Sequence, residues 1–177
     1  MSGLSARSWI VWLRDILPDM LVYRIVHRVY SSNLLASGVA GRWNREGSKV
    51  IYASESIPLA LLENFFRRQG VGFNRDFKIM FLEVPEPFSL KTVNMYDLGS
   101  AWRDPYDYSG CQPVGDHWFR MLQSLVLQVP SAVMPEAYNY VINTLHPEFN
   151  RVKILAVTDL VPDPRIEEIL KNYSKKA

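Results

Sequence analysis

Short apolar runs, separated by glycine, proline and polar clusters, predict β-strands along most of the chain. Val, Ile, Leu and aromatic side chains favour the pleated, half-buried surface of a strand, and turn residues bound each run. The run 77–84 is apolar at both alternations, which predicts a strand buried on both faces. Five apolar runs predict strands in this way: 20–30, 49–53, 77–84, 124–134, which Pro130 interrupts, and 152–157.

Helical spacing of apolar residues predicts four helices. In one of them Ser56 is placed to cap the first turn, Pro58 falls where a missing N–H does no harm, and Gly70 ends the helix. Asp116 is a candidate N-cap for another. The predicted helices are 9–16, which is amphipathic and ends before Pro18, then 56–69, 116–124 and a C-terminal stretch within 163–177.

Loops separate these elements, and strands do not alternate regularly with helices. Residues 31–48 and 94–115 are rich in turn formers, and 136–150 has no decisive pattern. Regular alternation marks a doubly wound sheet, so the sequence instead predicts an α+β fold with short strands in mixed or antiparallel sheets and flanking helices. We expect one domain, with an N-terminal helical extension (1–18), a core (21–160) and a C-terminal helix and tail (163–177).

Composition and charge narrow the class of protein. Apolar residues make up 48% of the chain and charged residues 21%, which is ordinary for a globular protein. The net charge is +2 without a basic run, so we expect no direct nucleic-acid binding. The apolar stretch 9–13 is too short for a membrane span, and the single cysteine, Cys111, fits a reducing compartment. We therefore expect a cytoplasmic protein without a membrane contact.

Common catalytic and metal-binding motifs are missing from the sequence. It contains no glycine-rich phosphate loop, no HExxH and no GxSxG, and His27, His117 and His146 lie far apart. No metal site is expected from this spacing. Cys111 is either a nucleophile or, as a lone cysteine more often is, a packing residue.

One carboxylate has an unusual place. On a helical wheel Glu63 borders the apolar arc of Leu59, Leu62, Phe65 and Phe66, about 40° from the first of them. A partly desolvated carboxylate needs a cationic or hydrogen-bonding partner. Glu63 therefore either pairs with a surface arginine, which the wheel alone favours, or belongs to a site.

Two arginines have equally open roles. Arg24 lies in a predicted strand next to Tyr23, and Arg42 follows Gly41 in a loop. The planar guanidinium group suits a two-point grip on phosphate or carboxylate. For Arg24 alone, an ion pair with Glu63 is the plainer interpretation. Two arginines, a glycine-rich loop and a half-buried acid together indicate an anionic ligand.

Polar side chains in the second half of the chain have local alternatives. Ser131 follows Pro130, where a serine usually bonds its own backbone. Asn139, Asn143 and His146 form a polar series that either lines a site or caps loops.

Taken in order, these stretches resemble one family. The series is YR (23–24), GRWNREG (41–47), VIYAS (50–54), the helix with Glu63, VPSAV (129–133) and N-x-x-x-N-x-x-H-P (139–147). This ordered set closely resembles the RES-domain family, the toxin components of bacterial toxin–antitoxin pairs, from about 21 to about 160. Members often have proline where this chain has Thr144, which makes Asn143 and His146 the weakest matches.

The resemblance implies an ADP-ribosyltransferase-like fold and an activity on NAD, which would be a substrate. Family members deplete NAD by hydrolysis or phosphorolysis, and some are mono-ADP-ribosyltransferases. The family's arginine, glutamate and serine fall on Arg24, Glu63 and Ser131, which are the implied catalytic residues. The residues implied to bind NAD are Arg42, Tyr52, Tyr23 and Asn139.

The resemblance also implies a protein partner, a small helix-turn-helix antitoxin that covers the active site. A homodimer of the toxin within such a complex is a further expectation. Two other functions stay open: modification of a host protein by mono-ADP-ribosylation, and a non-catalytic module that binds a nucleotide or a partner. Nothing in the sequence selects water, phosphate or a protein as the acceptor.

Overall fold

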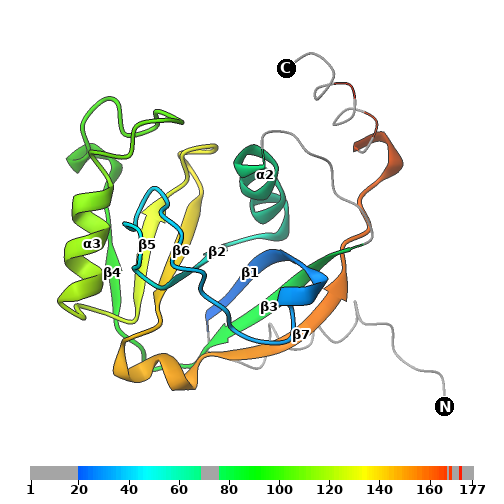
Figure 1. The fold of residues 1–177 in the computed structure, drawn as a ribbon, viewed down its shortest axis with the longest axis horizontal. Helices are drawn as coiled ribbons and strands as arrows, with labels where there is room; N and C mark the ends of the chain where they lie inside the picture. The colour runs from blue at the N-terminus through cyan, green and yellow to red at the C-terminus, as the bar shows by residue number, and fades with distance from the viewer. Residues whose placement is uncertain (1–19, 69–75, 167, 169–171, 173–177) are drawn as a thin grey trace.

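The structure, a computed structural model, describes residues 20–68, 76–166, 168 and 172. These residues contain β1 (Met20–His27), β2 (Val50–Ser54), β3 (Phe77–Val84), β4 (Leu90–Thr92), β5 (Val126–Pro130), β6 (Tyr138–Asn143) and β7 (Lys153–Asp159). The strands form one 7-stranded sheet in the order β4-β5-β6-β2-β1-β3-β7 (Figure 1). Neighbouring strands are antiparallel except β4 and β5, which are parallel.

The helices of the described residues flank this sheet. They are α2 (Ile57–Arg67) and α3 (Gln112–Arg120), with the 3₁₀ segments η1 (Arg28–Tyr30), η2 (Met95–Asp97) and η3 (Pro147–Arg151). The α2 N-terminus is built as the sequence predicts, because the Ser56 side chain accepts a hydrogen bond from the Leu59 N–H and Pro58 stands in the first turn.

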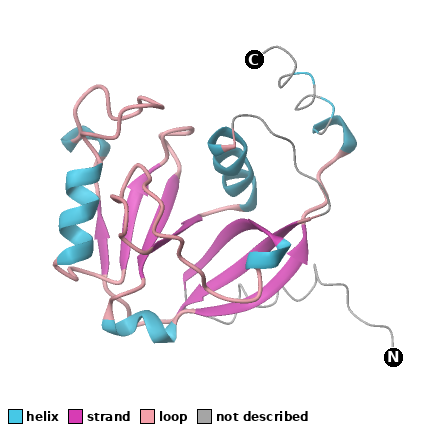
Figure 2. Cartoon of the chain, viewed as in Figure 1, coloured by secondary structure: helices cyan, strands magenta, loops and turns pink. Residues whose placement is uncertain are grey.

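The sheet divides into two halves between β1 and β2. β1 pairs with β3 along its whole length, from Met20 opposite Val84 to His27 opposite Phe77. It pairs with β2 only where Tyr23 lies opposite Ser54, at the end of β2. Figure 2 shows β4, β5 and β6 diverging from β1, β3 and β7. We call β4-β5-β6-β2 the first half, β1-β3-β7 the second half, and the place where they part the fork.

Apolar packing assigns one helix to each half. A central cluster joins the halves, with Val22 from β1 and Ile142 from β6 both fully buried. Ala60 and Phe65 of α2 pack on the second half, and Trp118 of α3 packs on the first half. Each fully buried large apolar side chain stabilises the fold by about 1.5–3 kcal/mol, so these clusters hold α2 and α3 firmly on their own halves.

The start at Asp116 predicted for the helix 116–124 is wrong. α3 begins at Gln112, and Pro113 occupies its first turn. Asp116 lies inside the helix, where its buried carboxylate forms ion pairs with Arg120 (3.0 Å) and Arg45 (3.8 Å). Arginine partners, rather than the free N–H groups of a helix start, therefore satisfy this acid.

Two strands escaped prediction. β6 lies within the unassigned segment 136–150, because Asn139 and Asn143 interrupt the apolar alternation on one of its faces. β4 is a strand of 3 exposed residues, too short to produce a pattern. The first predicted strand ends at His27 instead of running to residue 30, since η1 follows it.

The helix α2 is confirmed, but its buried face is shifted from the predicted arc. Leu59 and Phe65 are buried, whereas Leu62 and Phe66 are 37% and 51% exposed. Ala60 is buried in their place, since its small side chain lets the helix lie close to the sheet.

Some expectations fall on the ends of the chain. The predicted helix 9–16 lies outside the described residues, as does most of the segment 163–177, of which 164–166 are helical. In the portion of the chain that the structure describes, no helix is both long enough and apolar enough to cross a membrane.

Candidate active site

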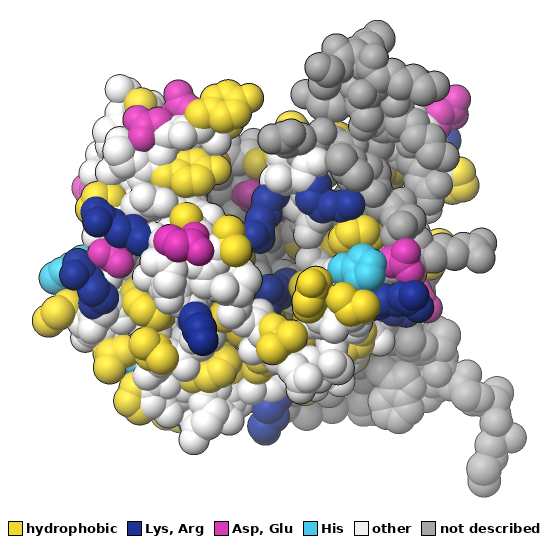
Figure 3. All heavy atoms as spheres, in the orientation of Figure 1, with side chains coloured by type: hydrophobic (Ala, Val, Ile, Leu, Met, Phe, Trp, Pro, Cys, Tyr) yellow, Lys and Arg dark blue, Asp and Glu magenta, His cyan; other side chains and the backbone are white. Residues whose placement is uncertain are grey.

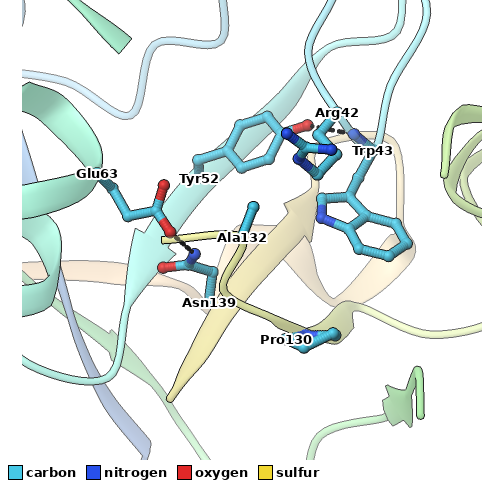
Figure 4. Close-up of a pocket in the computed structure, with 7 residues that line it drawn as sticks. All are labelled: Arg42, Trp43, Tyr52, Glu63, Pro130, Ala132 and Asn139. Carbon is cyan, nitrogen blue, oxygen red and sulfur yellow. Dashed lines mark hydrogen bonds between the residues drawn. The ribbon is translucent and has the colours of Figure 1, made fainter. Parts of the chain in front are cut away.

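A small open pocket lies beside the fork, where side chains of both halves meet. Figure 3 shows a recess on this face, with an acidic side chain inside it and basic side chains next to it. Residues of α2, which packs on the second half, line the pocket together with residues at the ends of β5 and β6 from the first half (Figure 4). Its lining residues are Arg42, Trp43, Tyr52, Glu63, Pro130, Ala132 and Asn139.

Glu63 forms one wall of the pocket, which we call the acidic wall. Its Oε1 accepts hydrogen bonds from Ser131 Oγ (2.6 Å) and Asn139 Nδ2 (2.5 Å). Both donors are neutral, so they orient the carboxylate without cancelling its charge. Within the described residues these hydrogen bonds go to Oε1 alone, which leaves Oε2 for a ligand.

Ser131 supports Glu63 from below the pocket surface. The side chain is 0% exposed, and its hydroxyl oxygen accepts from the Val133 and Met134 N–H groups at 3.1 and 2.9 Å. Its single hydroxyl proton goes to Glu63. This serine thus combines the local backbone bonding expected from the sequence with a contact to the candidate acid.

Arg42 forms the opposite wall, which we call the basic wall. Its guanidinium group donates to the carbonyl oxygens of Trp102 and Asp104, the latter at 2.8 Å. The same group lies 4.7 Å from the centre of the Tyr108 ring. Carbonyl oxygens satisfy N–H donors but carry no full charge, so the positive charge of Arg42 is available to an anion.

Tyr52 anchors the turn that carries Arg42. Its hydroxyl donates to Asn44 Oδ1 (2.8 Å) and accepts from the Trp43 N–H (3.0 Å). Burial raises the pKa of Tyr52 above its usual value, so the phenol stays protonated. Because the hydroxyl is occupied, what Tyr52 offers the pocket is its ring (Figure 4).

Asn44 and two glycines complete this turn. The amide of Asn44 is buried and donates to the carbonyl groups of three loop residues, at 3.0 to 3.1 Å. A Cβ at Gly41 would lie 2.9 Å from both Asn44 Oδ1 and the Tyr52 hydroxyl. A Cβ at Gly115 of α3 would lie 1.9 Å from the Trp43 carbonyl oxygen, so only glycine lets the helix back the turn so closely.

Arg24 and Tyr23 do not line the pocket. Arg24 donates to the Leu35 carbonyl oxygen (3.0 Å), and Tyr23 packs edge-on against Phe81 on the α2 side of the sheet. Burial, with a contribution from Arg67, lowers the pKa of Arg24 to about 10, which leaves it charged at neutral pH. The ion pair between Arg24 and Glu63 is absent from the described residues.

Sequence reasoning missed several residues at the site. Trp43, Pro130 and Ala132 line the pocket as ordinary apolar residues, which carry no chemical signal. Arg67 acts electrostatically on both Arg24 and Tyr52, and its place one helical turn after Glu63 is the signal that would have found it.

The remaining candidates have structural roles. Asn143 donates to the Phe119 carbonyl oxygen (2.9 Å), and His146 caps η3 by accepting from the Glu148 N–H. Cys111 is 1% exposed within the α3 cluster, and burial raises the pKa of its thiol. Among the described residues, no group of three His, Cys, Asp or Glu side chains is arranged to hold a metal ion.

Fold and pocket together define an α+β protein whose site has an acidic and a basic wall at the fork of a split sheet. More particularly, the chain belongs to the RES domain family, whose model matches residues 21–165. The family resemblance drawn from the sequence is thereby confirmed.

Named relatives cover most of the chain. The protein Toxin Res of Pseudomonas putida is 30% identical over 149 residues, covering 83% of this chain and 99% of the relative. Toxin Res of Yersinia enterocolitica is 30% identical over 134 residues, covering 73% and 88%. The Prs ADP-ribosylating toxin of a Sphingobium species is 28% identical over 145 residues, covering 78% and 90%.

A solved structure shares the fold. A chain of the M. tuberculosis MbcT–MbcA toxin–antitoxin complex superposes with a TM-score of 0.64 and 20% identity, covering 87% of this chain and 90% of that one. At this identity the likeness concerns the fold alone. It confirms the α+β fold class predicted from the sequence.

Proposed function

We propose that this chain is the toxin of a toxin–antitoxin pair and that it consumes NAD by cleaving the bond between nicotinamide and ribose. One observation carries the proposal: a carboxylate oriented by neutral donors, Glu63, lines the same pocket as Arg42, which forms no ion pair with an acid of the described residues. The family of the chain and the names of its relatives support the toxin role.

In the proposed reaction the bond from C1′ of the ribose to the nicotinamide nitrogen breaks, and its electron pair leaves with nicotinamide. Positive charge builds on the ribose in the transition state. The acceptor, which is water, phosphate or a protein side chain, then bonds C1′ and gives up its proton, where it carries one, to solvent. Oε2 of Glu63, the oxygen without a partner in the described residues, would accept a hydrogen bond from a ribose hydroxyl and stabilise that charge. A carboxylate oriented in advance acts without reorganisation, and it acts more strongly in a poorly solvated site.

The basic wall would hold the diphosphate of NAD. Arg42 would exchange the carbonyl oxygens of Trp102 and Asp104 for phosphate oxygens, which are stronger acceptors. Arg24 and Arg67 add positive potential near the pocket. The ring of Tyr52, which lines the pocket, offers a stacking surface for nicotinamide, and Asn139 shapes the ribose end. Tyr23 lies one strand beyond Ser54 in the same register.

Transfer of ADP-ribose to a protein is the second candidate function. It rests on the likeness to the Prs ADP-ribosylating toxin, and it uses the same site with a protein side chain as acceptor. Water and phosphate remain the other acceptors, and they distinguish a glycohydrolase from a phosphorylase.

The proposed partner is a small helix-turn-helix antitoxin that covers the pocket. It is supported by the fold shared with a chain of the MbcT–MbcA toxin–antitoxin complex. A homodimer of the toxin within that complex belongs to the same proposal. Co-expression with the neighbouring open reading frame tests it: a stable complex that blocks NAD loss supports the antitoxin, and a toxin of unchanged activity contradicts it.

Proton NMR of the purified chain with NAD tests the central claim. We expect nicotinamide to be released, and Glu63→Gln, which preserves shape and removes charge, to abolish most of the release. Dependence on inorganic phosphate identifies a phosphorylase, and indifference to it identifies a hydrolase. In a second assay, NAD labelled in its ADP-ribose part is added with a cell lysate. If the label accumulates only on protein, the chain is a transferase. No turnover in any assay would leave the chain a binding module and would overturn the proposal.

A further inference from the structure

Ser54 is a buried polar residue to which neither the sequence nor the family match assigned a role. It is the last residue of β2, it is 4% exposed, and it stands at the fork. In the register of the sheet it lies between Tyr23 of β1 and Asn139 of β6. Its hydroxyl donates to Asn139 Oδ1 at 2.6 Å.

The orientation of the Asn139 amide follows from its two partners. An ionised carboxylate only accepts hydrogen bonds, so the side that faces Glu63 must be the NH₂ group, which donates at 2.5 Å. The carbonyl side of the amide then faces Ser54, whose hydroxyl is its donor. Three groups thus form one directed series, from the Ser54 hydroxyl through the Asn139 amide to Glu63 Oε1.

We propose that Ser54 is a positioning residue, which acts on Glu63 through Asn139 and thereby fixes the direction of the carboxylate that meets the ribose. This inference rests on the proposed function. Without the Ser54 hydroxyl, the Asn139 carbonyl oxygen loses its donor, and only the contact with Glu63 holds the amide. The amide is then free to rotate, and each excursion that brings its oxygen toward Glu63 places two acceptors face to face, which repel. The carboxylate is held less firmly in its position in the pocket.

The serine is buried behind Asn139, so it contributes orientation and not a contact with substrate. Asn139 lines the pocket, whereas Ser54 does not. A group that positions the acid for the transition state changes kcat more than it changes KM. If the serine only stabilised the strand, its replacement would lower the free energy of unfolding and leave kcat unchanged.

The chain offers a matched control in Ser124. This serine is 2% exposed, accepts from Trp118 Nε1 (2.7 Å) and donates to the Val126 carbonyl oxygen (2.8 Å), within the α3 side of the core. Ser124→Ala therefore removes a buried hydroxyl of similar connectivity that takes no part in the series to Glu63.

Kinetics of nicotinamide release by the purified full chain form the first test. We expect Ser54→Ala to lower kcat about tenfold with little change in KM, the effect of losing one orienting hydrogen bond. Ser54→Thr, which retains the hydroxyl, should restore most of the rate. Ser124→Ala should lower the midpoint of thermal unfolding without lowering kcat. A Ser54→Ala variant with the kcat of Ser124→Ala would overturn the proposal.

A double-substitution cycle shows whether Ser54 acts through Asn139. If it does, adding Ser54→Ala to Asn139→Ala should change kcat by less than about twofold, because the intermediary is already gone. A full additional tenfold loss in the double variant would contradict the relay.

A spectrum of the side-chain amides makes the test independent of turnover. In ¹⁵N-labelled protein, the NH₂ signals of Asn139 are identified by their loss in Asn139→Ala. We expect Ser54→Ala to shift them, and Ser124→Ala to leave them in place. If wild-type protein released no nicotinamide, the proposed function would fall, and this spectrum alone would decide whether Ser54 orients the amide. Unshifted Asn139 signals in Ser54→Ala would refute the inference.

Discussion

The acidic and basic walls of the pocket are built in different ways. Glu63 is held by two side chains, Ser131 and Asn139, which belong to the opposite half of the sheet and are themselves hydrogen-bonded. Arg42 is held by backbone carbonyl oxygens of Trp102 and Asp104, in an irregular segment between β4 and α3. One wall uses specific side chains, and the other uses acceptors that any oxygen anion can replace.

This difference matches what each wall has to do in the proposed reaction. A carboxylate that stabilises a developing charge is most effective when it does not move, which needs directional partners on several sides. A guanidinium group that captures a diphosphate must release its resting partners, and neutral carbonyl groups are weaker competitors than phosphate. The four predictions that follow test this contrast, beginning with the largest expected effect.

Substitution of the acid should have the largest effect. Glu63→Gln is expected to lower kcat for nicotinamide release by about 10²–10³-fold, the usual loss when a preorganised electrostatic group is removed. The glutamine carbonyl can still accept from Ser131 and Asn139, so thermal unfolding should change little. Nicotinamide release at the wild-type rate by a folded variant would show that the acidic wall is not catalytic.

Removal of the amide behind the basic wall should chiefly affect stability. Asn44→Ala leaves three carbonyl groups and the Tyr52 hydroxyl without their buried partner, and we expect about 2–4 kcal/mol less free energy of unfolding. Urea denaturation measures this. Asn33→Ala, in an exposed part of the same loop, is the control and should cost less than about 0.5 kcal/mol. Equal losses would mean that the turn does not depend on its buried amide.

The basic wall itself should control binding more than chemistry. Arg42→Ala is expected to raise the KM for NAD about tenfold, with a smaller fall in kcat, and Arg42→Lys should recover only part because it lacks the two-point grip. Arg45→Ala removes a charge from the same turn at a residue that points to Asp116, and it should leave KM nearly unchanged. If kcat fell and KM did not, Arg42 would share the role assigned to Glu63.

The smallest effect is expected at the Tyr52 hydroxyl. Tyr52→Phe should cost about 1 kcal/mol at neutral pH, the typical value of one hydrogen bond. Because burial raises the pKa of Tyr52, folding favours the neutral phenol. Its contribution is complete below about pH 10 and declines as the pH rises further. Urea denaturation at pH 8 and pH 10.5 should show the difference between wild type and variant shrinking. A constant difference would contradict the burial of this phenol.

The sequence singled out Glu63 more clearly than the residues around it, and its catalytic role stays a prediction. Glu63 was recognisable because a carboxylate at the edge of an apolar arc needs a partner, and the structure supplies Ser131 and Asn139. The arc itself was partly misassigned, because packing against the sheet depends on which side of the helix carries a small residue, here Ala60. The start of α2 after Ser56 was predictable because helix capping depends on neighbouring residues in the sequence.

Residues that act through others left no signal in the sequence. Ser54 is one serine at the end of a strand, and only the register with Asn139 gives it a role. Trp43 and Pro130 line the pocket because distant segments meet there, which no local pattern encodes. Arg24 shows the converse, since an arginine in an apolar strand attracts notice but lies off the pocket wall and bonds a loop carbonyl.

The arrangement of Glu63 also has a consequence for the order in which the chain is made. Glu63 precedes Ser131 by 68 positions and Asn139 by 76, and both partners lie on the other half of the sheet. The ribosome therefore synthesises Glu63 long before Ser131 and Asn139, which orient it. An unfinished or truncated chain that ends before β6 contains Glu63 but lacks Asn139, one of the two donors that orient its carboxylate. In the proposed reaction, the growing chain gains an oriented acid only once β6 has been synthesised and folded.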